Sequence, residues 1–287
     1  PPTTTLSHRS SGSRQMSNPP VALTIAGSDS GGGAGIQADL RTFSFHQVHG
    51  TSALTCVTAQ NTTGVTRVDA LPPEAVIAQV EAVTNDIGVQ AAKTGMLLNQ
   101  SIIEAVAAHL TANPIASLVV DPVMVSRTGD KMIDGGANAA LPSQLLPLAT
   151  ILTPNRYEAQ ILADMTIDTL EDLKQAAQNI LELGPKAVIV KGGGFTDELR
   201  GIDVWCAAEA DGQPNCVALK TELVETTNTH GTGCTLSSAI AANLAKEMSP
   251  LEAVTAAKTY VTEALKHSLP IGKGQGPVGH FYQLLDA

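Results

Sequence analysis

Aromatic and charged residues are both scarce in this chain. Of its 287 residues, 3% are aromatic and 15% are charged, and 17 Lys and Arg against 27 Asp and Glu give a net charge of −10. Nucleic-acid binding requires basic patches and stacking rings, and a polybasic membrane anchor requires clustered Lys and Arg. No stretch reaches the ~18 consecutive apolar residues of a spanning helix. The composition therefore predicts no nucleic-acid partner and no membrane association.

Cysteine is also rare, and its spacing excludes the usual cysteine-based sites. The four cysteines form no CxxC pair and no His/Cys cluster with zinc spacing; they are Cys56, Cys206, Cys216 and Cys234. Four thiols in a chain of this size do not make a disulfide scaffold, which favours a reducing compartment. We therefore expect a cytoplasmic globular protein, and most such proteins are enzymes.

Residues 1–20 lack the apolar run of a signal peptide. They are rich in Ser, Thr and Pro and contain no acidic residue, which is typical of a disordered tail and also of a transit peptide. We expect a disordered tail, with Met16 as a plausible start, ahead of a single domain over residues 21–287. No linker or internal repeat divides that domain.

From residue 21 onward, short apolar strands alternate with helical patterns. Strands are predicted at 21–26, 52–57, 91–94, 118–121, 151–153 and 187–190, with an edge strand at 217–223. Helices are predicted at 73–85, 101–110, 157–162, 170–183, 233–246 and 251–267. Continuous apolar strands separated by helices predict an α/β fold, with a mainly parallel sheet covered by helices on both faces.

Two glycine-rich segments call for comparison with known phosphate-binding fingerprints. The Walker A pattern is absent, and the GxGxxG formed by Gly274, Gly276 and Gly279 follows no predicted strand and contains Pro277. We expect that match to be accidental. Residues 27–35 join a strand to a helix, and they form either a flexible surface loop or a loop whose backbone closely approaches a ligand.

Two polar side chains lie near this loop in the predicted fold. Asp39 falls about 40° from Phe43 on a helix with ~100° per residue, at the margin of an apolar face. A carboxylate there either reaches solvent or accepts hydrogen bonds from a buried ligand. Gln60 follows the second strand, where it makes either a loop hydrogen bond or a ligand contact.

The segment 229–234, Thr-His-Gly-Thr-Gly-Cys, gives the sharpest local signal. The apolar spacing of Leu236, Ile240 and Leu244 places a helix start near Gly233, with free amides directed toward the glycines. Such a helix start predicts an anion site. Cys234 lies where the helix dipole would lower a thiol pKa, and His230 is expected to be a loop residue.

These segments together resemble a known family of kinases. The motifs are the glycine loop and its helix at 26–40, Thr-Ala-Gln-Asn at 58–61, Lys-Thr-Gly-Met-Leu at 93–97, Asp-Pro-Val-Met at 121–124, Thr-Pro-Asn at 153–155, Lys-Gly-Gly at 191–193 and Asn-Thr-His-Gly-Thr-Gly-Cys at 228–234. Their order is similar to that of the bacterial hydroxymethylpyrimidine/phosphomethylpyrimidine kinases of thiamine biosynthesis. That resemblance implies the three-layer ribokinase-like fold and covers residues 21–281. Pyridoxal kinases share much of the pattern and are the nearer alternative; the other is a nucleotide- or pyrimidine-binding protein that has lost catalysis.

The resemblance also implies roles for individual residues. The pyrimidine substrate would be bound by Gly27, Asp39, Gln60 and Met96. The anion hole and catalytic group would be Gly231, Thr232, Gly233 and Cys234. ATP would be bound by Asn155, Glu158 and Lys191, and Mg²⁺ by Asp121 and Glu158. The family further implies phosphorylation in two successive steps and a homodimer, and Gly279 departs from its pattern because a polar residue is expected there.

Overall fold

The computed structural model describes residues 18–124, 135–195, 199–209 and 212–285. Within these ranges one sheet contains nine strands: β1 (Val21–Asp29), β2 (His49–Asn61), β3 (Gly64–Ala70), β4 (Ala91–Thr94), β5 (Ser117–Val120), β6 (Ile151–Leu152), β7 (Ala187–Val190), β8 (Ile202–Ala208) and β9 (Pro214–Lys220). The expected tail at 1–20 lies almost wholly outside the described residues.

The α-helices of the described ranges are α1 (Gly35–Phe45), α2 (Pro73–Asp86), α3 (Gln100–Ala112), α4 (Gly135–Ala140), α5 (Arg156–Ala163), α6 (Leu170–Leu181), α7 (Thr232–Ala245) and α8 (Pro250–Lys266). Short helical turns lie at Leu141–Leu145, Leu146–Leu148, Gly192–Gly194 and Tyr282–Leu284. Among the described helices, none combines the length and apolar character that crossing a bilayer requires.

The strand order across the sheet is β3-β2-β1-β4-β5-β6-β7-β8-β9, which places the first strand of the chain well inside the sheet. Every neighbouring pair from β2 to β7 is parallel, whereas β3 at one edge and β8 and β9 at the other are antiparallel. The prediction of a mainly parallel sheet is confirmed.

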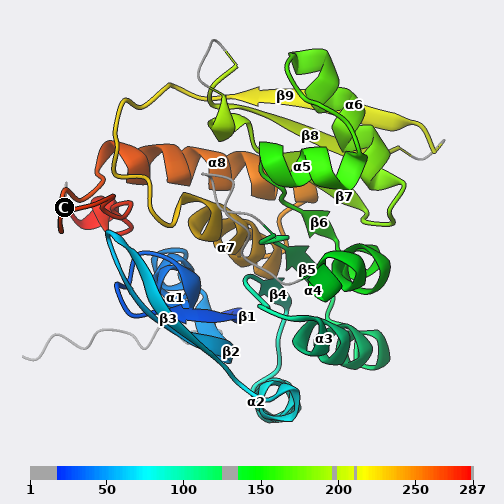
Figure 1. The fold of residues 1–287 in the computed structure, drawn as a ribbon, viewed down its shortest axis with the longest axis vertical. Helices are drawn as coiled ribbons and strands as arrows, with labels where there is room; N and C mark the ends of the chain where they lie inside the picture. The colour runs from blue at the N-terminus through cyan, green and yellow to red at the C-terminus, as the bar shows by residue number, and fades with distance from the viewer. Residues whose placement is uncertain (1–17, 125–134, 196–198, 210–211, 286–287) are drawn as a thin grey trace, which may run out of the picture.

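Helices cover both faces of the sheet, which gives the expected three layers. Helices α1, α7 and α8 pack together on one face, and α2 to α6 lie on the other (Figure 1). Alternation along the central strands explains the two cores, because neighbouring residues point to opposite faces. On β4, Ala91 packs toward α7 and α8 while Ala92 packs toward α3; on β5, Val119 faces the first core, and Leu118 and Val120 face the second.

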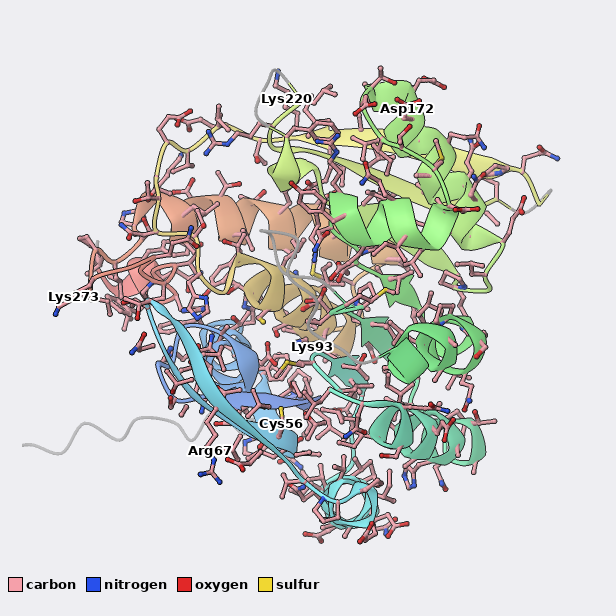
Figure 2. The ribbon with its side chains drawn as sticks, in the orientation of Figure 1. Cys56, Arg67, Lys93, Asp172, Lys220 and Lys273 are labelled. Atoms are coloured by element: carbon pink, nitrogen blue, oxygen red, sulfur yellow. A yellow bond between two sulfur atoms is a disulfide. The ribbon has the colours of Figure 1, made fainter. Side chains whose placement is uncertain are left out.

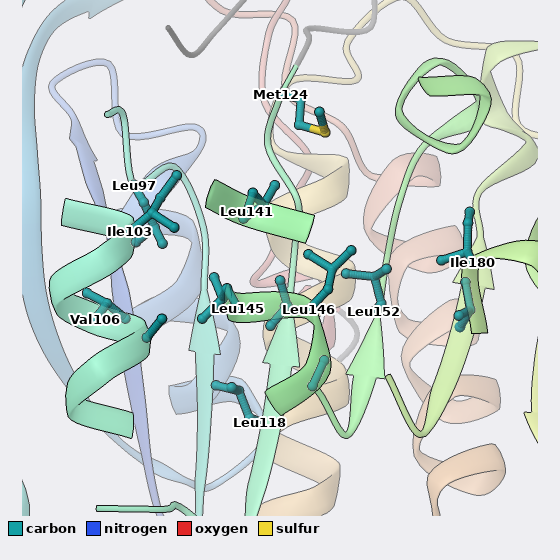
Figure 3. Packing of buried hydrophobic residues seen from close by; sticks show 14 of the residues in the cluster. Leu97, Ile103, Val106, Leu118, Met124, Leu141, Leu145, Leu146, Leu152 and Ile180 are labelled. Atoms are coloured by element: carbon teal, nitrogen blue, oxygen red, sulfur yellow. The ribbon is translucent and has the colours of Figure 1, made fainter. Parts of the chain in front are cut away.

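The core on the α3 side is built from branched aliphatic side chains. Figure 3 shows Leu118 of β5 facing Leu145 and Leu146, with Ile103 and Val106 of α3 beside them. Each such side chain contributes roughly 1.5–3 kcal/mol when fully buried. This packing fixes the central strands, and with them the positions of the residues that follow each strand.

Helix α7 is buried along almost its whole length. All residues from 235 to 245 are buried, and none of them is charged. A helix that is apolar or small on every side packs inside a protein, and α7 contacts β1, β4 and β5 as well as α1 and α8. Its amino end therefore lies at the edge of the sheet where the parallel strands end.

The edge strands differ most from the sequence-based expectation. β3 and β8 were not predicted, and the predicted strand at 217–223 is observed as β9, Pro214–Lys220. β3 is exposed at every residue, so it has no apolar pattern to reveal it. β8 contains Asp203, which is buried against Lys258 at 2.7 Å, and a charged residue inside a strand hides its apolar character.

Two of the four cysteines form a disulfide. Cys206 of β8 and Cys216 of β9 are direct partners in the antiparallel register, with Cα atoms 4.1 Å apart. The sequence-based view of four separate thiols is therefore wrong for this pair, since the unpredicted strand β8 brings them together. Cys56 and Cys234 are free.

Candidate active site

Polar side chains gather where the parallel strands end, at the edge of the sheet that binds ligands in α/β folds. Asp121 follows β5, and its Oδ1 accepts hydrogen bonds from Lys191 Nζ at 3.1 Å and from Thr153 Oγ1 at 3.2 Å. Its Oδ2 accepts a hydrogen bond from Ser237 Oγ of α7 at 3.3 Å. Asp121 thus connects three strand ends with the buried helix.

Glu158 lies beside this group because α5 begins with a capping box. Asn155 accepts a hydrogen bond from Glu158 N at 3.0 Å, and Glu158 accepts one from Asn155 N at 2.8 Å. Its second oxygen accepts a hydrogen bond from Met124 N at 3.2 Å. Burial raises the pKa of Glu158 to about 7; Lys191 opposes this rise and Asp121 adds to it.

At the start of α7, the backbone has the glycine-bounded helix start on which the predicted anion site depends. Gly231 precedes the helix at φ 82°, a conformation that favours glycine. A Cβ on Gly231 would lie 1.8 Å from Gly33 O, and one on Gly233 would lie 3.5 Å from Lys191 Nζ. The start of α7 therefore lies next to the Lys191 ammonium, and the helix dipole and this charge both favour a bound anion.

The structure corrects the expected state of Cys234. Burial raises the pKa of its thiol to about 11; Lys93 and the N–H of Gly35 lower it, and the carboxylates of Asp39 and Asp121 raise it. The expectation of a lowered pKa considered only the helix dipole. Burial and two nearby carboxylates outweigh that dipole, so the thiol of the free enzyme carries its proton at neutral pH.

Asp39 is completely buried, so the alternative in which its carboxylate reaches solvent is wrong. Its carboxylate accepts hydrogen bonds from Thr24 Oγ1 at 2.6 Å, from Ser238 Oγ at 2.5 Å and from Lys93 Nζ at 3.0 and 2.9 Å. Lys93 is also fully buried, and its label lies near the centre of the view in Figure 2. Although burial opposes the charged form, Asp39 raises the pKa of Lys93 above its ordinary value.

Sequence reasoning gave Lys93 no role, although a signal was present. Lys93 lies inside a short apolar strand, and a buried ammonium requires a buried partner. Asp39 was the unexplained carboxylate on a neighbouring apolar helix face. Because Lys93 and Asp39 carry opposite charges, the sequence allowed the inference that they are partners.

The residues expected to bind the pyrimidine surround the glycine loop. A Cβ on Gly27 would lie 2.7 Å from Cys56 Sγ and 3.0 Å from Met96 Cε, so these three residues are in contact. Gln60 lies at the end of β2, where its backbone O accepts a hydrogen bond from Ser30 Oγ at 2.7 Å. Gln60 and Met96 therefore contact the glycine loop, residues 27–35, of which Gly27 is the first residue.

A cavity of about 420 Å³ contains the residues expected to bind ATP and to catalyse the reaction. Its lining includes Asp121, Asn155, Glu158, Lys191, Gly231, Thr232, Gly233 and Cys234. This volume suits a small ligand. The predicted pyrimidine residues Gly27, Asp39, Gln60 and Met96 do not line this cavity, whose boundary on that side includes Ala34 of the glycine loop.

Comparison with known proteins identifies the family. Residues 29–279 match the profile of the family described as phosphomethylpyrimidine kinase. The chain belongs to this family. It is similar to the hydroxymethylpyrimidine/phosphomethylpyrimidine kinase of Synechococcus elongatus, with 61% identity over 265 residues that cover 92% of this chain and 98% of the relative. The protein is accordingly a phosphotransferase with a ribokinase-like fold.

Solved structures of related kinases have the same fold. The phosphomethylpyrimidine kinase of Clostridium difficile is 41% identical with a TM-score of 0.75, and the alignment covers 86% of this chain and 99% of that one. The pyridoxal kinase of Bacillus subtilis, solved as an ADP complex, is 39% identical with a TM-score of 0.84, covering 93% and 99%. This chain is thus similar in fold to both a phosphomethylpyrimidine kinase and a pyridoxal kinase.

In this kinase the segment after α8 closes one side of the site. A Cβ on Gly279 would lie 2.1 Å from His267 O, so only glycine fits where a polar residue was expected. The next residue, His280, is buried against α7, where its Nε2 lies 2.9 Å from Thr235 Oγ1. Burial lowers the pKa of His280 to about 4. The GxGxxG in this segment follows no strand, as expected of an accidental match.

Proposed function

We propose that this kinase transfers a phosphoryl group from ATP to the hydroxymethyl group of 4-amino-5-hydroxymethyl-2-methylpyrimidine, and then a second one to the monophosphate. The observation that carries the proposal is the cavity in which Lys191, Asp121 and Glu158 meet the glycine-bounded start of α7. Membership of the phosphomethylpyrimidine kinase family supports this pyrimidine as the acceptor.

The ATP side of the cavity combines positive charge with oxygen ligands. Lys191 and the amides from Gly231 to Cys234 would bind the phosphates, with Asn155 and Glu158 beside them. Mg²⁺ requires one or two carboxylates plus phosphate oxygens and water, and Asp121 with Glu158 fits that requirement. When bound, the cation would neutralise charge on the phosphates. Ionised Glu158 would then be favoured, since the cation opposes the effect of burial.

On the acceptor side, the proposed ring contacts are Gly27, Gln60 and Met96. Their position around the glycine loop, next to Cys56, supports this role. We assign Asp39 an indirect part, because its oxygens already accept hydrogen bonds from three side chains. It would act through Lys93, whose charge lowers the pKa of Cys234.

Cys234 is proposed to take the proton of the substrate hydroxyl. Its thiol must first release its own proton to water in the cavity that it lines, which requires the surrounding charge to change as substrates bind. Asp121 raises the pKa of Cys234 in the free enzyme, so a cation bound to Asp121 would remove part of that effect. The backbone amides of Gly231 to Cys234 would meanwhile stabilise charge on the phosphoryl group.

We further propose a homodimer that works in the cytoplasm, where ATP is available. The exposed valines Val57, Val65 and Val68 lie on the β2–β3 hairpin at one edge of the sheet. Exposed valines beside an open sheet edge favour pairing with a second copy of the chain. The partner would cover both the valines and the open edge of β3.

An assay of ATP consumption with two acceptors distinguishes the proposed function from its alternative. The similarity to a pyridoxal kinase in fold favours pyridoxal as the second candidate. We expect kcat/KM to be at least tenfold higher with hydroxymethylpyrimidine, because a misfitting ring costs roughly 1–3 kcal/mol of transition-state binding. Higher kcat/KM with pyridoxal would reverse the assignment.

A further inference from the structure

Asp29 collects hydrogen bonds from the glycine loop and from the segment before α7. Its Oδ1 accepts a hydrogen bond from Gly31 N at 2.8 Å, and its Oδ2 accepts bonds from Gly33 N at 3.1 Å and Ala34 N at 2.8 Å. The fourth partner is His230, whose Nε2 lies 2.8 Å from Oδ2. Four donors use most of the capacity of one carboxylate, so this buried group fixes the shape of the loop.

Asp29 is suited to this role by its charge. Burial alone would raise its pKa, but the hydrogen bonds from His230, Ala34 and Gly31 lower the pKa below its ordinary value overall. The carboxylate is therefore ionised at neutral pH. Hydrogen bonds to an ionised acceptor are stronger than those between neutral groups.

His230 is held on three sides. Its backbone N–H donates to Gly276 O at 3.1 Å, its backbone O accepts from Val278 N at 3.2 Å, and its ring bonds to Asp29. The sequence-based expectation of an ordinary loop residue missed these contacts. Because Gly231 follows directly, the anchored His230 sets the direction in which the anion-site backbone enters α7.

The glycine loop and the segment before α7 also approach each other closely at glycine residues. A Cβ on Gly33 would lie 2.3 Å from His230 Cδ2, and a Cβ on Gly231 would lie 1.8 Å from Gly33 O. At the end of the glycine loop, the N–H of Gly35 lies near Cys234 and lowers the pKa of its thiol. The loop that surrounds the proposed pyrimidine residues is thereby in contact with the anion site at two points near its carboxyl end.

We propose that the Asp29–His230 pair is a latch that positions the anion site, residues 231–234, against the glycine loop, residues 27–35. This inference rests on the proposed function, because the latch aligns the acceptor hydroxyl with the transferred phosphoryl group. Displacing catalytic groups by about 1 Å costs roughly 10²-fold in rate. His230 is a positioning residue here and takes no part in proton transfer.

Kinetics of matched His230 variants test the latch. His230→Leu removes the donor, and we expect kcat to fall about 10²-fold with a smaller change in the KM for ATP. His230→Gln retains an N–H near the position of Nε2 and should keep kcat within about tenfold of the wild type. His49→Gln, at an exposed histidine of β2, is the control and should retain wild-type activity. Equal losses in the Leu and Gln variants would contradict the latch.

A double-mutant cycle shows whether the two residues act together. Asp29→Asn and His230→Leu should give losses in kcat that overlap strongly in the double variant, because both changes disturb the Asp29–His230 contact. Multiplicative losses would mean that the residues act independently. A fall in thermal stability with unchanged kcat would assign the pair a purely structural role and would also contradict the proposal.

Amide hydrogen exchange provides a readout that does not depend on activity. In folded His230→Leu protein, exchange at residues 31–34 should be about tenfold faster than in the wild type, because the loop loses its anchor. Unchanged exchange there would overturn the latch even if the enzyme proved inactive on the pyrimidine. A wild type that fails to phosphorylate the pyrimidine would instead contradict the proposed function.

Discussion

Cys234→Ala is expected to lower kcat roughly 10²–10⁴-fold, the usual effect of removing a positioned acid–base group. The KM for ATP should change little, because the backbone amides of Gly231 to Gly233 remain. Steady-state kinetics of the folded variant measure both constants. A variant with near-wild-type kcat and reduced stability would show that Cys234 only fills space in the first turn of α7.

Lys93→Met is expected to destabilise the protein by about 3–5 kcal/mol, because it leaves the buried Asp39 carboxylate without its counter-charge. Denaturant unfolding measures this change in the free energy of unfolding. Lys174→Met is the control, since Lys174 forms an exposed pair with Glu171 and should cost no more than ~1 kcal/mol.

The double variant Asp39→Asn, Lys93→Met separates charge from packing. Removing both charges should recover part of the stability lost in Lys93→Met, because no unpaired charge remains at this position in the interior. If the double variant is less stable than Lys93→Met by the full cost of Asp39→Asn, the ion pair is not the cause. A loss in Lys93→Met no larger than that in Lys174→Met would contradict the buried pair itself.

The central part of the fold was predictable because its strands are mostly apolar, with Lys93 in β4 as an exception. Strands β1, β4, β5 and β7 are buried on both faces, and this pattern is visible in the sequence. The edges were less predictable: β3 is exposed throughout, and β8 contains a buried aspartate. Whether a residue of an edge strand is buried depends on neighbours far along the chain, and the local sequence periodicity gives no information about those neighbours.

In the candidate site, the grouping of the residues expected to bind phosphate was predictable, whereas the buried network was not. The helix start at Gly233 followed from local pattern, and the family resemblance implied Asn155, Glu158 and Lys191; these residues line one cavity. Lys93 bonds to Asp39 across 54 positions, and His230 to Asp29 across 201. The pKa of Cys234 was mispredicted for the same reason, since the burial and carboxylates that raise it come from the tertiary fold.

The identity of the product tests the central claim most directly. Mass spectrometry of a reaction containing wild-type protein, magnesium, ATP and hydroxymethylpyrimidine should show the pyrimidine with one added phosphoryl group, followed by a species with two. Cys234→Ala protein should form both products far more slowly. The account would be contradicted if ATP were hydrolysed or passed to pyridoxal while the pyrimidine stayed unphosphorylated.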